Sequence, residues 1–131
     1  MDSLAVKTTK REEFTDITRE VQNYISNQKL QSGVLTLYCS HTTAALTINE
    51  GADPAVVRDI LVYLERLAPK RGDYQHMEGN SDAHIKTSLI GPSLQVIVQD
   101  GRLMLGTWQR IFFTEFDGPR SRKVWIKWIE G

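Results

Sequence analysis

Apolar residues recur at two different spacings along the chain, and the spacing separates expected strands from expected helices. Alternating or nearly continuous apolar runs, rich in β-branched residues, predict strands over residues 4–9, 13–17, 34–39, 44–48, 94–98, 111–116 and 124–129. A charged turn separates the first two runs, which favours a hairpin at the edge of a sheet. The strand at 34–39 is apolar on both faces and is therefore expected to be buried.

A spacing of three and four residues predicts two amphipathic helices. The first covers residues 18–28, with Thr18 as the expected N-cap. The second covers residues 54–67 and carries the clearest end signals in the sequence. Asp53 is its expected cap, a proline occupies its first position, and Pro69 ends it.

Residues 70–83 are polar and without periodicity, which is typical of a long loop. A short third helix is expected over residues 83–89, with Asp82 as its cap. Strands follow one another through hairpin turns and not through regular crossover helices. The pattern therefore predicts an α+β fold over residues 1–131, a mainly antiparallel β-sheet or sandwich packed with two longer helices and one short helix.

Composition narrows the classes of function. The 16 basic and 16 acidic residues give a net charge of zero, so the field that steers proteins to nucleic acid is missing. Cys39 is the single cysteine, which excludes an intrachain disulfide. No run approaches the roughly 20 apolar residues of a membrane span, and the first residues lack an export signal. We therefore expect a cytoplasmic protein without a nucleic-acid or membrane partner.

The chain has three histidines, each in a polar context: His41, His76 and His84. Neutral imidazole is the commonest ligand of zinc, and three imidazoles leave one coordination position open for water or substrate. Their spacing matches no compact ligand motif, so ordinary loop histidines are an equally weighted alternative.

Several residues are candidates for binding an anion. Residues 79–82 lead directly into the third helix, where backbone N–H groups and the helix dipole favour a phosphate. Lys86, Arg120 and Arg122 are the candidate cations, since an arginine fork matches a phosphate group. The alternative for the two arginines is a solvated basic turn.

Other residues are candidates for binding a flat ring or for transferring a proton. Trp108 stands between a glycine and Gln109, so its indole could stack on a ring while the amide binds the ring edge. Core packing is an alternative for this tryptophan. Glu50 has no structural explanation in the sequence and is a candidate general base, whereas Asp82 is explained as a cap.

Four segments together resemble the signature blocks of the YjbQ family, whose members are labelled secondary thiamine-phosphate synthase. These blocks cover residues 41–50, 78–86, 106–109 and 115–120. The resemblance implies an α/β-sandwich-like protomer, usually a homotrimer. It implies that His41, His76 and His84 are metal ligands, and that His41 also belongs to a catalytic group with Glu50, Asn80 and Asp82.

The resemblance also implies a function. Some family members join a pyrimidine diphosphate to a thiazole phosphate, so the expected ligand is a small phosphorylated molecule. The expected cofactor is a divalent metal, zinc at the histidines, with magnesium possible alongside the substrate. The alternatives are a metal-dependent hydrolase, a protein that binds a metal or phosphorylated metabolite without turnover, and a structural protein.

Overall fold

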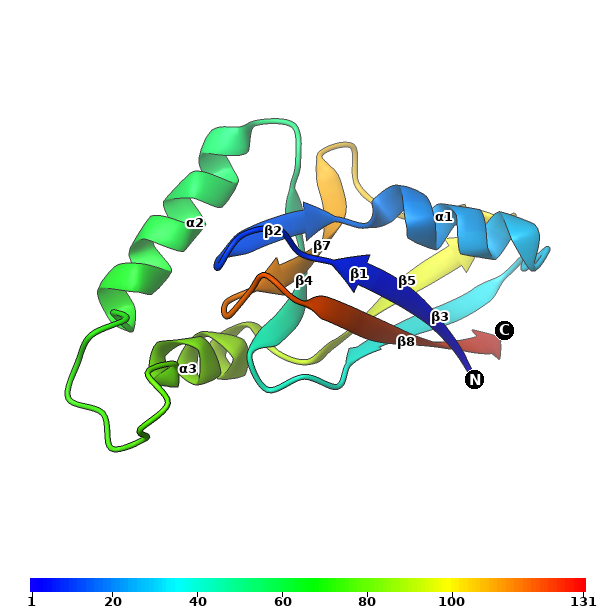
Figure 1. Ribbon diagram of the computed structural model, residues 1–131. Coiled ribbons are helices and arrows are strands. Elements are labelled where there is room, and N and C mark those ends of the chain that lie inside the picture. The colour runs from blue at the N-terminus through cyan, green and yellow to red at the C-terminus, as the bar shows by residue number, and fades with distance from the viewer.

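The computed structural model describes residues 1–131 and confirms the predicted α+β class. Its elements in chain order are β1 (Asp2–Lys7), β2 (Glu13–Asp16), α1 (Thr18–Asn27), β3 (Gly33–Cys39), β4 (Ala44–Glu50), α2 (Pro54–Leu67), α3 (Ser81–Ile90), β5 (Ser93–Gln99), β6 (Arg102–Leu103), β7 (Gln109–Glu115) and β8 (Ser121–Glu130). Figure 1 shows two curved sheets with helices on their outside.

Every strand pair is antiparallel. The larger sheet has the strand order β1-β8-β3-β5-β6, and the smaller sheet has the order β2-β7-β4. Strand β3 was expected to be buried on both faces, but only one face is buried: Leu35, Leu37 and Cys39 point into the core, whereas Tyr38 on the other face is 47% exposed. The main core of 15 buried residues joins both sheets to α1, through Val21 and Ile25.

Helix α2 begins and ends as its sequence predicts. The Asp53 side chain accepts a hydrogen bond from the N–H of Ala55 at 2.9 Å, and Pro54 occupies the first turn. However, none of its residues is fully buried, and the helix lies along the outside of the molecule (Figure 1). Leu61 and Leu64 pack onto a small second core around Phe116.

The predicted caps of the other two helices are wrong. The N-cap of α1 is Ile17, and the carboxylate of Asp16 accepts the N–H of Thr18 at 2.9 Å. The N-cap of α3 is Asn80, so Asp82 lies inside the helix. Helix α3 spans 10 residues, as does α1, and is therefore not shorter than the first helix.

Strand β6 was not predicted because it is only two residues long, too short to carry a periodicity. None of the three helices combines the length and the hydropathy that crossing a bilayer requires.

Candidate functional site

A polar pocket lies where the β3–β4 loop, the start of α3 and the β7–β8 turn meet. Its volume is about 320 Å³, and none of its lining residues is hydrophobic. It is lined by Ser40, His41, Thr42, Thr43, Glu78, Asn80, His84, Asp117, Arg120 and Arg122. The fold thus brings together five of the residues singled out in the sequence, namely His41, Asn80, His84, Arg120 and Arg122.

Arg122 belongs to a buried network beneath this pocket. Its Nε donates to Glu115 Oε1 at 2.8 Å, and its Nη2 donates to Thr43 Oγ1 at 2.9 Å and to Glu115 Oε2. Glu115 also accepts the hydroxyl of Thr8 at 2.8 Å and the N–H of Asp117 at 3.0 Å. Burial alone would raise the pKa of Glu115, but these hydrogen bonds outweigh it and hold the pKa below its ordinary value.

The β7–β8 turn fixes Arg120 at the mouth of the pocket. Arg120 donates from Nε to the carbonyl of Asp117 at 2.9 Å and from Nη2 to the Asp117 carboxylate at 3.0 Å. The amide of Asn80 donates to the same carboxylate at 2.9 Å, which ties the turn to the start of α3. Gly118 lies against the backbone of the β1–β2 turn, where a Cβ would collide with the carbonyl oxygen of Lys10.

His41 is hydrogen-bonded to strand β8 of the larger sheet, next to the last residue pair of β3 and β8. Its Nε2 accepts the backbone N–H of Lys123 in β8 at 3.0 Å. Burial and the positive charge of Arg122 lower the pKa of His41, so the ring is neutral at neutral pH.

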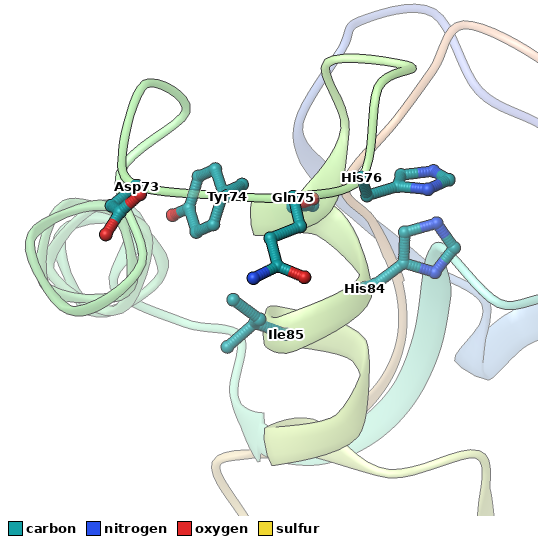
Figure 2. Close-up of a pocket in the computed structure, with 7 residues that line it drawn as sticks. Asp73, Tyr74, Gln75, His76, His84 and Ile85 are labelled. Carbon is teal, nitrogen blue, oxygen red and sulfur yellow. The ribbon is translucent and has the colours of Figure 1, made fainter.

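His84 separates the polar pocket from a second cavity. This loop pocket has a volume of about 550 Å³ and is lined by Asp73, Tyr74, Gln75, His76, Ser81, His84 and Ile85. Figure 2 shows the rings of His76 and His84 next to each other at one end of this pocket. Their centroids are 5.3 Å apart with an edge-on geometry, and His76 Nε2 lies 3.9 Å from a Glu78 carboxylate oxygen. All three histidines therefore lie around the first two turns of α3.

The positions of the side chains do not fit a single ion held by all three histidines. In this structure the one set of three ligand atoms within 4.8 Å of each other belongs to Glu12, Glu65 and Asp82. The histidines form no such set, and the Nε2 atom of His41 is already hydrogen-bonded. His76 and His84 remain as neighbouring imidazoles.

Asp82 and Lys86 lie in a separate ion-pair cluster on the other side of α3. The Lys86 ammonium donates to Glu12 at 2.8 Å, Glu65 at 2.7 Å and Asp82 at 3.1 Å. Arg11 donates to both oxygens of Asp82. Lys86 and Asp82 are fully buried there. These ion pairs engage both groups outside the polar pocket, and the roles expected for them, phosphate binding and catalysis, stay predictions.

Glu50, Trp108 and Gln109 lie at the far end of the smaller sheet. Glu50 is opposite Gln109 in the β4–β7 register, whereas Ala44 at the pocket end of β4 is opposite Glu115. Six residues of extended strand correspond to about 20 Å. Trp108 is 63% exposed at this far end. Within one chain these three residues therefore do not reach the polar pocket.

Some residues at the pocket were not predicted as site residues. Thr43 and Asp117 line it, and Glu115 supports it from below. Asp117 and Glu115 belong to the same Glu-Phe-Asp-Gly-Pro-Arg block as Arg120, so this block was the available signal. Nothing in the sequence links Thr43 to Arg122, which lies 79 residues further along the chain.

Comparison with known proteins decides the family. A family model described as UPF0047 protein YjbQ-like matches residues 2–131. The chain belongs to the YjbQ family. A UPF0047 protein of Methanocaldococcus jannaschii is 53% identical over 95% of this YjbQ chain and 90% of its own length. The UPF0047 protein YugU of Bacillus subtilis is 51% identical over 97% of both chains.

Solved structures of YjbQ relatives have the same fold. A YjbQ/UPF0047 family protein of Clostridium acetobutylicum superimposes with a TM-score of 0.95 at 53% identity, covering 98% of this chain and 100% of its own. A protein of Sulfolobus solfataricus, described as YbjQ-like and of unknown function, gives a TM-score of 0.93 at 28% identity, covering 99% and 96%. The fold is therefore shared across relatives of widely different identity.

Proposed function

We propose that the polar pocket binds the phosphate or diphosphate group of a small phosphorylated molecule, and that the protein is a transferase of the thiamine-phosphate synthase type. The observation that carries this proposal is a cavity lined by two arginines and no hydrophobic residue. Neither Arg120 nor Arg122 makes a hydrogen bond from Nη1 within the chain. Each guanidinium thus retains donors for an anion.

The reaction expels pyrophosphate from the methyl carbon of a pyrimidine, so negative charge grows on the leaving group. Donors that are already fixed in place stabilise this charge without reorganising during the reaction. Arg122 is held by its buried pair with Glu115, and Arg120 is held by Asp117. The two arginines therefore suit a leaving diphosphate.

The start of α3 supports the same assignment. No side chain caps this helix: the amide nitrogen of Asn80 donates to Asp117, and the side-chain oxygen of Asn80 accepts no hydrogen bond within the chain. Uncapped N–H groups and the positive end of the helix dipole stabilise an anion near the first turn. Together with the arginines they give the pocket two independent sources of attraction for phosphate.

A metal enters the proposal in two ways. Magnesium would arrive bound to the diphosphate, where Glu78 and Asp117 are the carboxylates that line the pocket. Zinc would have His76 and His84 as its histidine ligands, because their rings are neighbours. Elemental analysis of protein purified without chelator or an affinity metal tests the zinc expectation. Protein without stoichiometric metal would contradict it.

The binding proposal is tested by calorimetric titration with pyrophosphate. Arg120→Ala should weaken the affinity about ten- to hundredfold, since a charge-assisted hydrogen bond contributes roughly 1.5–3 kcal/mol. Arg19→Ala is the matched control, because Arg19 is an exposed arginine of α1 outside the pocket. Equal affinity of the Arg120 variant and the parent would refute the anion role of the β7–β8 turn.

Turnover separates the enzyme from its alternatives. Protein supplied with magnesium, a pyrimidine diphosphate and a thiazole phosphate should release pyrophosphate only when both substrates are present. Release of phosphate from one substrate alone would indicate a hydrolase. Binding of pyrophosphate without any turnover would indicate a protein that holds a phosphorylated metabolite, and the transferase proposal would fail.

A further inference from the structure

We propose that His41 serves as a hydrogen-bond donor to an oxyanion through Nδ1–H, and not as a metal ligand. The assignment of the ring proton follows from the fold alone, whereas the role of that proton rests on the proposed function of the pocket. The ligand class is a tetrahedral oxyanion, such as the terminal oxygens of a phosphate monoester or a diphosphate.

The first step is the hydrogen bond between the ring and the sheet. A backbone N–H can only donate, so the Nε2 atom that accepts from Lys123 at 3.0 Å must carry a lone pair. In a neutral imidazole the proton is then on Nδ1. Rotating the ring by half a turn would place Cε1–H against the amide and leave this N–H without an acceptor. The geometry therefore selects one tautomer and one ring orientation.

The second step explains why the backbone N–H of Lys123 is hydrogen-bonded to a side chain and not to a neighbouring strand. Cys39 and Val124 are the last residue pair of β3 and β8 in the sheet register. Beyond them β3 has ended, while β8 continues with Lys123 toward the β7–β8 turn. Strand β3 therefore provides no carbonyl for the N–H of Lys123, and the imidazole of His41 accepts this hydrogen bond in its place. The tautomer is built into the end of the sheet.

The third step concerns metal binding. An ion needs a lone pair, but Nε2 uses its lone pair for Lys123 and Nδ1 carries the proton. Binding a metal would require His41 to break this bond and to change its tautomer. A doubly protonated ring is also disfavoured, because its Nε2–H would point at the N–H of Lys123.

The fourth step is the free donor. No group of the chain accepts a hydrogen bond from Nδ1 of His41, and the ring lines the polar pocket with Arg120 and Arg122. A neutral N–H donor beside two guanidinium groups can bind an anion, whereas it has no lone pair with which to bind a cation. His41 therefore distinguishes oxyanions from metal ions within the pocket.

Long-range proton–nitrogen correlation spectra of ¹⁵N-labelled protein test the tautomer directly. In the absence of ligand, His41 should show the Nδ1–H form. Added pyrophosphate should shift the Nδ1 resonance, while added zinc should shift His76 and His84 before His41. An Nε2–H tautomer of His41, or a zinc response that begins at His41, would overturn the assignment.

Two substitutions separate the donor from a purely structural role. His41→Gln can place an oxygen near the position of Nε2, which keeps an acceptor for Lys123 but removes the Nδ1 donor. His41→Asn can place an amide N–H near the position of Nδ1 and keeps the donor. We expect the glutamine variant to bind pyrophosphate about tenfold more weakly and the asparagine variant to retain most of the affinity, with Arg19→Ala, which lies outside the pocket, as control.

The opposite order of the two variants would overturn the donor role and assign His41 to structure. If the parent protein shows the Nδ1–H tautomer but does not bind pyrophosphate, the donor role and the proposed function both fail, while the tautomer assignment stands. If the parent binds pyrophosphate and both variants bind it equally well, only the donor role fails.

Discussion

Glu115 and Arg122 show how much depends on a single buried ion pair beneath the pocket. Their side chains are 0% and 4% exposed, and Glu115 has four hydrogen-bond donors around it. Such a pair adds little compared with an apolar pair, but removing one partner leaves the other charge buried and uncompensated. The pair thus fixes the position of Arg122 more than it raises overall stability.

We expect Glu115→Gln to lower the free energy of unfolding by about 3–5 kcal/mol, because the charge of Arg122 then remains buried without a counterion. Urea denaturation measures the effect. The control is Asp59→Asn, which breaks an exposed pair with Arg58 and should cost less than about 1 kcal/mol. Similar losses in the two variants would contradict a special role for the buried pair.

Stability should also depend on pH through Glu115 and Asp82. Burial alone would raise the pKa of Asp82, but hydrogen bonds from Arg11 and Lys86 hold this pKa below its ordinary value. The pKa of Glu115 is lowered in the same way by the hydrogen bonds that Glu115 accepts. A carboxylate whose pKa is lower in the folded state stabilises the protein above its unfolded pKa, near pH 4 to 4.5. This stabilisation is lost as the pH falls through the lowered pKa.

The urea midpoint should therefore be nearly constant from about pH 7 to pH 5 and should fall steeply below about pH 4. In Glu115→Gln the fall should be shallower, since one of the two groups no longer titrates. A parent midpoint that stays level down to pH 3 would refute this explanation.

At the scale of elements, features that depend on neighbouring residues in the sequence were predicted better than contacts between distant residues. The cap at Asp53 and the proline after it are adjacent in the sequence, so the start of α2 could be read directly. Asp82 also resembles a cap in sequence, but it pairs with Arg11, which lies 71 residues earlier in the chain. A single sequence contains no signal that would pair two residues so far apart. The strands were predicted well because alternation is local. The hairpin expected between the first two strands is wrong, because β1 pairs with β8 and β2 pairs with β7 in a different sheet.

The contacts of the histidines at the pocket also depend on residues that are distant in the sequence. Their polar contexts indicated a shared site, and the fold places all three around α3. The hydrogen bond of His41 to Lys123 spans 82 residues, and no spacing rule contains it. Likewise the burial of Lys86 could not be predicted, because its carboxylate partners come from three different elements or turns.

Helix α3 is fastened to the rest of the protein by the ion-pair cluster around Lys86. We expect Lys86→Ala to lower the free energy of unfolding by about 3–5 kcal/mol, because Glu12, Glu65 and Asp82 would lose the ammonium that they share and only Arg11, paired with Asp82, would remain as a cation beside them. Calcium should partly restore the thermal midpoint of this variant, since the three ligand atoms lie within 4.8 Å of each other. The parent, with its own ammonium in place, should show no comparable response to calcium.

A failure of calcium to raise the midpoint of the variant would show that the carboxylates separate once the ammonium is gone. Lys70→Ala is a suitable control, because Lys70 is an exposed lysine in the loop after α2 whose side chain makes no ion pair.

At the scale of the whole molecule, two features favour association. The outer face of the larger sheet exposes Tyr38, Ile97 and Ile129, the latter two by 63% and 57%, and α2 has no fully buried residue. The resemblance to YjbQ proteins implies a trimer. We therefore expect sedimentation equilibrium to give three times the 14.9 kDa of one chain at micromolar concentration. A monomer would contradict this expectation.

Association also bears on Glu50, Trp108 and Gln109, which lie about 20 Å from the pocket of their own chain. A role for Trp108 at a pocket therefore requires a neighbouring subunit. Trp108→Ala should leave the affinity for pyrophosphate unchanged in a monomer, and a loss of affinity would place the indole beside the pocket of another copy.

The ion-pair cluster has a consequence for heat resistance. Hydration of charged groups becomes less favourable as temperature rises, so the penalty for having removed the Lys86 ammonium and the Asp82 carboxylate from water shrinks on heating. The attraction between Lys86 and its carboxylates is affected much less. The cluster thus contributes more to stability in hot water than in cold water, at temperatures where hydrophobic burial no longer gains strength. The deficit of Lys86→Ala should accordingly be larger near the unfolding temperature than at room temperature, and α3 should be among the last helices of the parent protein to loosen on heating.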